Sequence, residues 1–144
     1  EIKNVKNARI VAMVSVSSNA QSATAGARKL LEENPQINLL VGFNEWSTLG
    51  VGMAIKELGL KDRVCAIGFD NNTECVGMLE TGELDTLIVQ NPFSMGYLAV
   101  MNAANILSGK KTESVIKTDV YVVDRSNMFS ADVQKILFGF DKYD

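Results

Sequence analysis

Residues 63–92 read RVCAIGFDNNTECVGMLETGELDTLIVQNP, and this stretch decides the fold of the chain. It contains two short apolar runs: residues 64–67 end at Gly68-Phe69-Asp70, and residues 84–89 end at Gln90-Asn91-Pro92. A short amphipathic segment with a polar beginning separates the two runs. This order of strand, helix and strand is typical of a parallel sheet in an α/β protein.

Polar side chains follow both predicted strands at the point where each strand ends. Asp70 comes directly after the first strand, and Gln90 comes directly after the second. In open α/β sheets, ligands bind at the carboxyl ends of the strands, because the loops diverge there and leave a crevice. We therefore expect Asp70 and Gln90 to lie where a polar small molecule is held.

The same alternation extends over the rest of the chain. The composition predicts further strands at residues 9–16, 37–43 and 117–123, and helices at about residues 20–33, 46–58, 73–81 and 92–107. For the tail, residues 130–144, we expect a helical turn or a loosely docked end. Short connections between alternating elements predict a doubly wound parallel sheet, with helices on both faces in a three-layer α/β/α arrangement.

Composition excludes several classes of function. The chain has 144 residues, a net charge of −3, two cysteines and no histidine. It therefore has the length of one domain and lacks the basic surface of a nucleic-acid-binding protein. No metal cluster or nucleophile motif is visible, so we expect no enzyme activity, no cofactor and no metal. Both cysteines, Cys65 and Cys75, are expected to be buried free thiols.

Four successive strand ends carry hydrogen-bonding residues. They are Ser17-Ser18-Asn19, Asn44-Glu45, Asp70-Asn71 and Gln90-Asn91. One polar residue after a strand is ordinary turn chemistry, but four such ends at one edge of a sheet indicate a lined binding site. For Asp70 itself, a role as helix N-cap or Asx turn remains the alternative.

Three ordered motifs carry a resemblance to a known family. They are LVGFNE at residues 40–45, AIGFD at residues 66–70 and GELDTLIVQNP at residues 82–92. Together they resemble the periplasmic sugar-binding proteins of the ribose- and galactose-binding type, over roughly residues 8–123. That superfamily also includes the effector domains of lac-repressor-type regulators. Its members have two α/β lobes that close over one sugar.

The resemblance implies roles for individual residues. Asn44 and Asp70 match positions that hydrogen-bond sugar hydroxyls, Phe69 lines the pocket beside them, and Gln90 matches the polar group at the hinge. The chemistry is suitable, because a carboxylate accepts from a hydroxyl and an amide can donate or accept. Family members usually place a stacking aromatic near residues 15–19, where this chain has Ser17, Ser18 and Asn19. Asn19 and Trp46 are therefore additional candidates for ligand contact, with Trp46 or Phe69 as the source of stacking.

The resemblance also divides the chain. It implies that residues 1–91 form part of the C-terminal sugar-binding lobe and that residues 92–117 form a crossover helix returning toward the N-terminal lobe. Residues 118–144 would then be the final strand and tail. The matched family extends well before Glu1, so we expect a C-terminal-half fragment. Its partner would be the missing N-terminal half or a second copy of the chain.

The leading hypothesis is an extracytoplasmic sugar receptor, in the periplasm or lipid-anchored at the cell surface. It would deliver its sugar to the membrane components of an ABC importer or to a chemoreceptor. The alternative is the effector-binding domain of a lac-repressor-type transcription regulator, although the fragment itself would bind no nucleic acid. An enzyme on the same sheet architecture is the third hypothesis.

Overall fold

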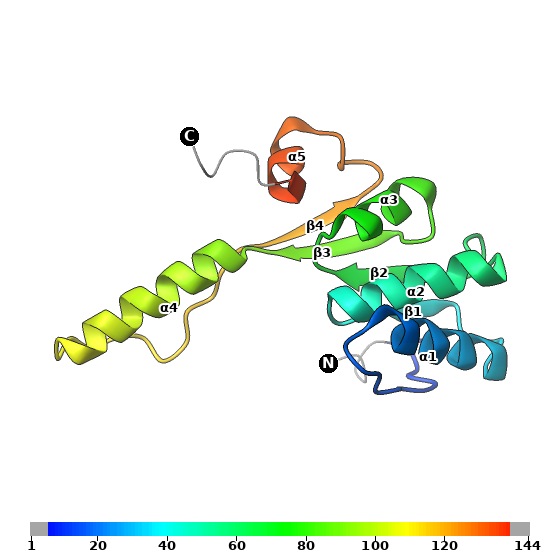
Figure 1. Ribbon diagram of the computed structural model, residues 1–144, viewed down its shortest axis with the longest axis horizontal. Coiled ribbons are helices and arrows are strands. Elements are labelled where there is room, and N and C mark those ends of the chain that lie inside the picture. Colours follow the sequence, from blue (N-terminus) through cyan, green and yellow to red (C-terminus); the bar gives the residue numbers. More distant parts are fainter. Residues whose placement is uncertain (1–5, 139–144) are drawn as a thin grey trace.

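The computed structural model describes residues 6–138, and the alternation of helices and strands continues through all of them (Figure 1). The elements, in order, are α1 (Ala20–Glu33), β1 (Leu39–Val41), α2 (Glu45–Leu58), β2 (Cys65–Phe69), α3 (Thr73–Thr81), β3 (Thr86–Gln90), α4 (Pro92–Leu107), β4 (Val120–Asp124) and α5 (Ala131–Phe138). The predicted α/β class is confirmed.

The four strands form one sheet in the order β1-β2-β3-β4. The first three strands are parallel, and β4 pairs with β3 in the antiparallel direction. The reversal follows from the path of the chain, which leaves the sheet through α4 and returns beside it (Figure 1). Parallel pairing of β1, β2 and β3 brings their carboxyl ends to the same edge of the sheet.

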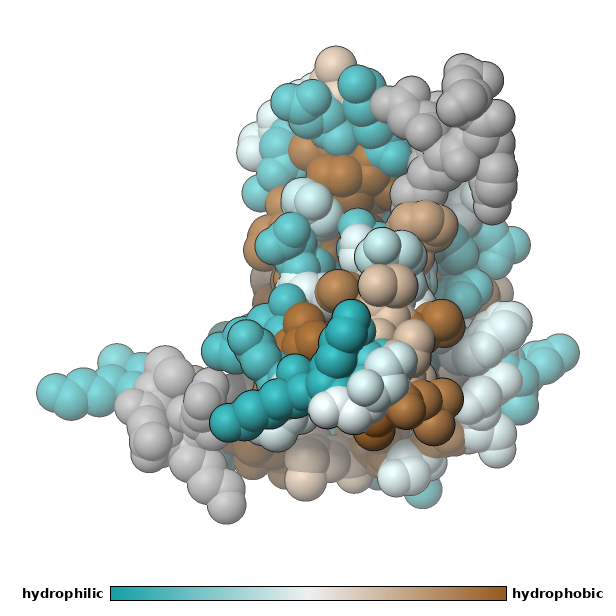
Figure 2. Space-filling model, turned by 90° about the vertical axis from the view of Figure 1, so that its left-hand side faces the viewer, coloured by the Kyte–Doolittle hydropathy of each residue, from teal (hydrophilic) through white to brown (hydrophobic). Residues whose placement is uncertain are grey.

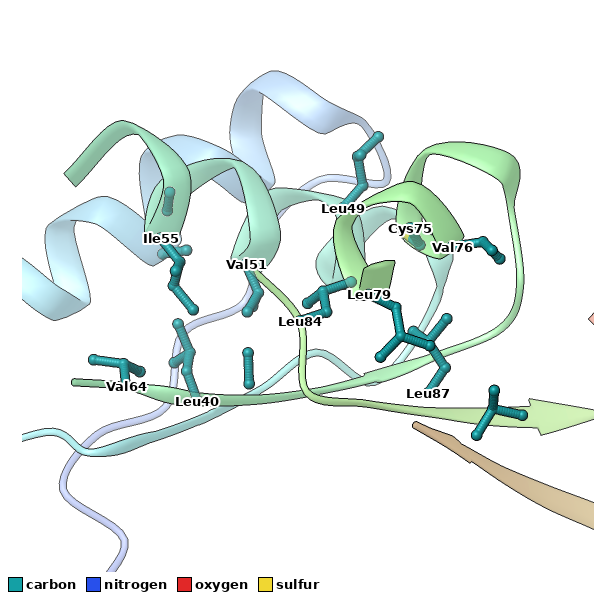
Figure 3. Close-up of a cluster of buried hydrophobic side chains, with 14 of the residues drawn as sticks. Leu40, Leu49, Val51, Ile55, Val64, Cys75, Val76, Leu79, Leu84 and Leu87 are labelled. Carbon is teal, nitrogen blue, oxygen red and sulfur yellow. The ribbon is translucent and has the colours of Figure 1, made fainter. Parts of the chain in front are cut away.

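The core lies between one face of the sheet and the helices α1–α3 (Figure 3). Strand register places Leu40 beside Ala66, and Leu87 beside Val123, on this covered face. Ile55 of α2 and Leu79 of α3 are completely buried against them. Side chains of one face only can point into this core, because successive residues of a strand alternate between the two faces.

The opposite face is covered much less well by the residues described. Leu39 is 48% exposed and Val122 is 59% exposed, and Cys65 is exposed beside Leu39. The prediction that Cys65 is buried is therefore wrong, since the strand presents it to this open face. Cys75 is buried as predicted, on α3 and facing the core.

The predicted strand at residues 9–16 is not formed. Within residues 6–138, no backbone hydrogen bond joins this segment to the sheet, and β1 pairs only with β2. The segment runs beside α1, where Val16 lies against Gly26. A β-branched segment becomes a strand only when a neighbour pairs with its backbone groups, and none does so here.

Helix α4 spans the predicted residues and projects away from the rest of the molecule (Figure 1). Asn91 caps its first turn by accepting a hydrogen bond from the Ser94 backbone N–H, and Pro92 occupies the first helical position. None of its residues is buried. Figure 2 views the molecule from the side on which α4 projects, and hydrophobic side chains appear on the surface there. No helix among the described residues has the length and apolarity needed to cross a membrane.

The tail forms a helix rather than a single turn. In α5, Leu137 is buried, and its carbonyl oxygen accepts a hydrogen bond of 2.6 Å from Asn71 Nδ2. The tail therefore docks against the loop that follows β2. The remainder of the predicted tail, residues 139–144, and the predicted beginning of the lobe, residues 1–5, lie outside the described part of the chain.

Candidate functional site

The site is built on the turn that follows β2. Asp70 adopts a left-handed backbone conformation, with φ at 69°, which an aspartate tolerates better than most residues. Its backbone N–H donates to the Ile88 carbonyl of β3 at 3.0 Å, so the turn is fixed to the neighbouring strand. The half-buried Asp70 carboxylate then accepts a long hydrogen bond of 3.5 Å from Gln90 Nε2. The two residues predicted to meet at the sheet edge are in contact.

The cap of α3 is a different residue. Asn72 is its N-cap, with Oδ1 accepting from the Cys75 backbone N–H at 2.8 Å. Asp70 is therefore not the N-cap of this helix, and its carboxylate is not occupied by that role. The Asn72 side chain also donates from Nδ2 to Glu45 Oε1 at 3.0 Å. This bond ties the loop after β2 to the first turn of α2.

Asn44 follows β1 and caps α2. Its Oδ1 accepts from the backbone N–H and the hydroxyl of Ser47, both at 2.9 Å, and Ser47 Oγ in turn accepts from the Asn44 backbone N–H. This capping box uses the oxygen of the side chain and fixes its orientation. The amide nitrogen of the exposed side chain takes no part in the box.

Thr48 joins α2 to the end of β2. Its hydroxyl donates to the Phe69 carbonyl at 3.0 Å and accepts from the Phe69 backbone N–H at 2.7 Å. Gly68 leaves room for this contact, since a Cβ there would lie 2.1 Å from Thr48 Cγ2. Sequence analysis missed Thr48, because nothing local distinguishes a threonine that bonds a distant strand from one that faces the helix core.

Phe69 pairs with a second ring that sequence analysis also missed. The ring centroids of Phe43 and Phe69 are 6.1 Å apart, with planes inclined by 34°. Phe43 is 73% exposed and directly precedes Asn44. The sequence did show that Phe43 ends one predicted strand and that Phe69 ends the next predicted strand. That correspondence could have indicated that the two rings lie close together.

The remaining candidates lie elsewhere. Asn19 caps α1 by accepting from the Ser22 backbone N–H at 2.8 Å, and with Trp46 it lines a surface groove between α1 and α2. The lining of that groove includes Arg28 and Glu57 but not the residues at the ends of β2 and β3. The structure thus brings Asp70 and Gln90 into contact at the strand ends, with Phe69 directly before Asp70. Asn44 follows the neighbouring strand and lines a groove with residues 14–16. Asn19 and Trp46 line the separate groove between α1 and α2.

Acidic side chains lie near the buried thiol of Cys75. Burial raises the pKa of Cys75 to about 12, and the nearby carboxylates of Glu45, Glu74 and Asp70 act in the same direction. The thiol is therefore protonated at neutral pH.

Comparison with known proteins places this geometry in a family. The periplasmic binding protein domain matches residues 1–111. The ribose import binding protein of Haemophilus influenzae is 31% identical over 94 residues, which are 65% of this chain and 32% of that protein. The chain thus spans about a third of the length of the curated relatives it matches.

Solved structures agree with the fold. A carbohydrate transporter solute-binding protein from Agrobacterium radiobacter, in complex with D-arabinose, has a TM-score of 0.80 and 30% identity. The match covers 90% of this chain and 44% of that one. A solute-binding protein of an ABC transporter from Agrobacterium vitis, with bound D-fucose, has a TM-score of 0.79 and 30% identity, over 90% and 45% of the two chains. The chain belongs to the periplasmic binding protein domain family.

Proposed function

We propose that the chain is the C-terminal part of an extracytoplasmic receptor that binds a neutral sugar. The observation that carries this proposal is the contact of Asp70 and Gln90 at the carboxyl ends of β2 and β3, with Asn44 at the end of β1. A carboxylate and two amides offer both acceptors and donors to the hydroxyl groups of a sugar. Phe69 contributes an apolar side to the same site.

The class of ligand follows from the charge of the site. The Asp70 carboxylate lies at the strand ends beside Gln90, and a phosphorylated or carboxylated sugar bound there would meet its repulsion. A neutral polyhydroxylated ligand avoids that cost. The relatives reported above are named for ribose import or are bound to D-arabinose or D-fucose, which supports the same class.

The proposed receptor acts by closing two lobes over its ligand. Residues 1–91 would belong to the ligand-binding lobe, residues 92–117 would cross toward the other lobe, and residues 118–144 would complete the sheet and tail. The hinge would lie near Gln90, where β3 gives way to α4. A sugar that contacts both lobes stabilises the closed form.

The partners of the chain follow from this arrangement. The exposed α4 and the open face of the sheet would contact the N-terminal half of the receptor, or a second copy of the chain in its place. Outside the cytoplasm, the loaded receptor would deliver its sugar to the membrane components of an ABC importer or to a chemoreceptor. The relatives named for transport favour this role over a lac-repressor-type regulator.

The test is a saturation-transfer NMR titration of the chain with D-ribose, D-allose, D-arabinose and D-fucose. One lobe supplies only half of the contacts, so we expect dissociation constants on the order of 1 mM, equivalent to about 4 kcal/mol of binding free energy. Asp70→Ala should weaken binding by about 1–3 kcal/mol, because the sugar and Gln90 lose a charged partner.

The matched control is Asp62→Ala, which removes an exposed aspartate from the turn before β2, away from the strand ends. Its titration should match that of the unmodified chain. Equal affinities for Asp70→Ala and Asp62→Ala would show that the strand-end carboxylate does not hold the sugar. If none of the four sugars receives saturation from the protein, the proposal that this chain binds a sugar is wrong.

A further inference from the structure

Two phenylalanine rings stand side by side at the ends of β1 and β2. The register pairs Val41 with Ile67, the last pair of β1 with β2, and Phe43 and Phe69 each lie two residues beyond this pair. Their centroids are 6.1 Å apart, within the range of a favourable aromatic contact. Phe43 nevertheless remains 73% exposed, so this contact leaves most of its ring uncovered.

The backbone beneath Phe43 is held rigidly. A Cβ at Gly42 would lie 2.6 Å from the Thr48 backbone nitrogen, so the first turn of α2 packs directly against the chain at this point. The Gly42 N–H donates to the Ile67 carbonyl at 2.9 Å. On the other side, Asn44 is fixed by its capping box with Ser47. Phe43 therefore projects from a fixed support.

Phe69 rests on the same turn of helix. Both its backbone N–H and its carbonyl are bonded to the hydroxyl of Thr48, the residue that follows Ser47 in α2. A single helical turn thus fixes the backbone beneath both rings. Binding of a ligand to the rings therefore costs little backbone entropy, because this backbone is already ordered.

Polar residues directly follow the two phenylalanines and could bind hydroxyl groups. Asn44 follows one ring and Asp70 follows the other, and Gln90 contacts Asp70. A pyranose has an apolar C–H face and a rim of hydroxyl groups. Binding sites for such small molecules combine aromatic walls with a few placed polar groups.

We propose that Phe43 and Phe69 form one aromatic platform that packs against the C–H face of a pyranose, while Asn44 and Asp70 bind the hydroxyl rim. This inference rests on the proposed sugar-binding function. It assigns the stacking role to Phe43 together with Phe69, and not to Trp46, which lines the groove between α1 and α2. It also favours sugars such as D-fucose, whose C3, C4 and C5 hydrogens share one face, over D-allose, whose axial 3-hydroxyl interrupts that face.

The experiment compares single variants by saturation-transfer NMR with D-fucose and D-allose. Phe43→Ala should weaken D-fucose binding by about two- to tenfold, as expected for loss of one aromatic contact, and should abolish the preference for D-fucose. Phe43→Leu keeps an apolar side chain without the ring and should behave like Phe43→Ala. Phe43→Tyr keeps the ring face and should bind as the unmodified chain does.

Trp46→Ala is the matched control, since it removes another exposed aromatic residue, which lies three positions after Phe43 in the sequence. Its affinity should be unchanged, and thermal unfolding of each variant confirms that the chain still folds. In the unmodified chain, the C–H protons of one D-fucose face should receive the most saturation.

Other outcomes separate the two proposals. If Asp70→Ala weakens binding and the Phe43 variants do not, the platform is wrong while the sugar-binding site stands. Loss of binding in Trp46→Ala with none in Phe43→Ala would move the stacking role to the other groove. A preference for D-allose in the unmodified chain would also overturn the platform. Binding of neither sugar would overturn both proposals.

Discussion

Helices α2 and α4 have similar lengths, 14 and 16 residues, and similar apolar sequences, yet they occupy opposite environments. Seven residues of α2 are buried, and none of α4 is. Helix α2 lies between α1, α3 and the sheet, whereas α4 projects away from the molecule (Figure 1). The difference shows that an apolar helix sequence indicates that the helix packs against something, but does not identify the element or partner against which it packs.

The surface of α4 is unusual in two respects. Its 16 residues include no charged side chain. Its exposed large hydrophobic residues are Phe93, Met95, Tyr97, Val100, Met101, Ile106 and Leu107. Soluble monomers rarely expose a continuous apolar surface of more than a few hundred Å², and larger ones mark sites of protein contact. This surface supports the proposed contact of α4 with another half or copy of the receptor.

The largest expected difference between the two regions is in the effect of truncating a leucine. Leu79 is fully buried in the core, and Leu107 of α4 is 89% exposed. Leu79→Ala should lower the free energy of unfolding by about 2–5 kcal/mol, because it leaves a cavity. Leu107→Ala should change it by less than about 0.5 kcal/mol. Urea denaturation followed by circular dichroism measures both values, and equal losses would mean that α4 is packed as tightly as the core.

Glycine substitutions should differ in sign as well as in size. A Cβ at Gly68 would overlap Thr48, so Gly68→Ala should cost about 1–3 kcal/mol through overpacking. At Gly96 in α4, nothing lies within 4 Å of the added methyl group. Gly96→Ala should therefore stabilise the chain by up to about 0.5–1 kcal/mol through helix propensity. Thermal unfolding compares the pair, and a destabilised Gly96→Ala would indicate that α4 has a close neighbour.

The smallest effect on stability is expected from a charge placed on α4. Val100 is exposed, so Val100→Lys should change the free energy of unfolding by less than about 0.5 kcal/mol. It should nevertheless reduce self-association of the chain, because a lysine must be desolvated in an apolar interface. Sedimentation velocity over a range of concentrations measures this. An unmodified chain that sediments as a monomer throughout would rule out association through α4.

Local signals in the sequence predicted the helices well. The bounds of α4 follow from Asn91-Pro92 at its beginning, and α2 and α3 end at Gly59 and Gly82, both in the left-handed conformation. These caps act through residues close in the chain, so the sequence carries them directly. Whether residues 9–16 form a strand could not be predicted in this way, because pairing depends on a neighbour that the sequence pattern does not identify.

The candidate site could likewise be predicted only in part. The meeting of Asp70 and Gln90 follows from the rule that parallel strands bring their carboxyl ends together, and the structure shows the contact. The separation of Asn19 and Trp46 from this group, and the pairing of Phe43 with Phe69, depend on how α1 and α2 pack. Packing of that kind is set by contacts between distant residues, which spacing in the sequence does not record.

The free edge of β1 has a further consequence for the behaviour of the chain in concentrated solution. Residues 10–16 lie beside this edge, carry no charge and are rich in β-branched residues, and Met13 is 85% exposed. Segments of this composition next to unpaired backbone groups can stack between molecules as cross-β fibrils. Amyloid-type aggregation of this protein would therefore begin at this corner of the molecule.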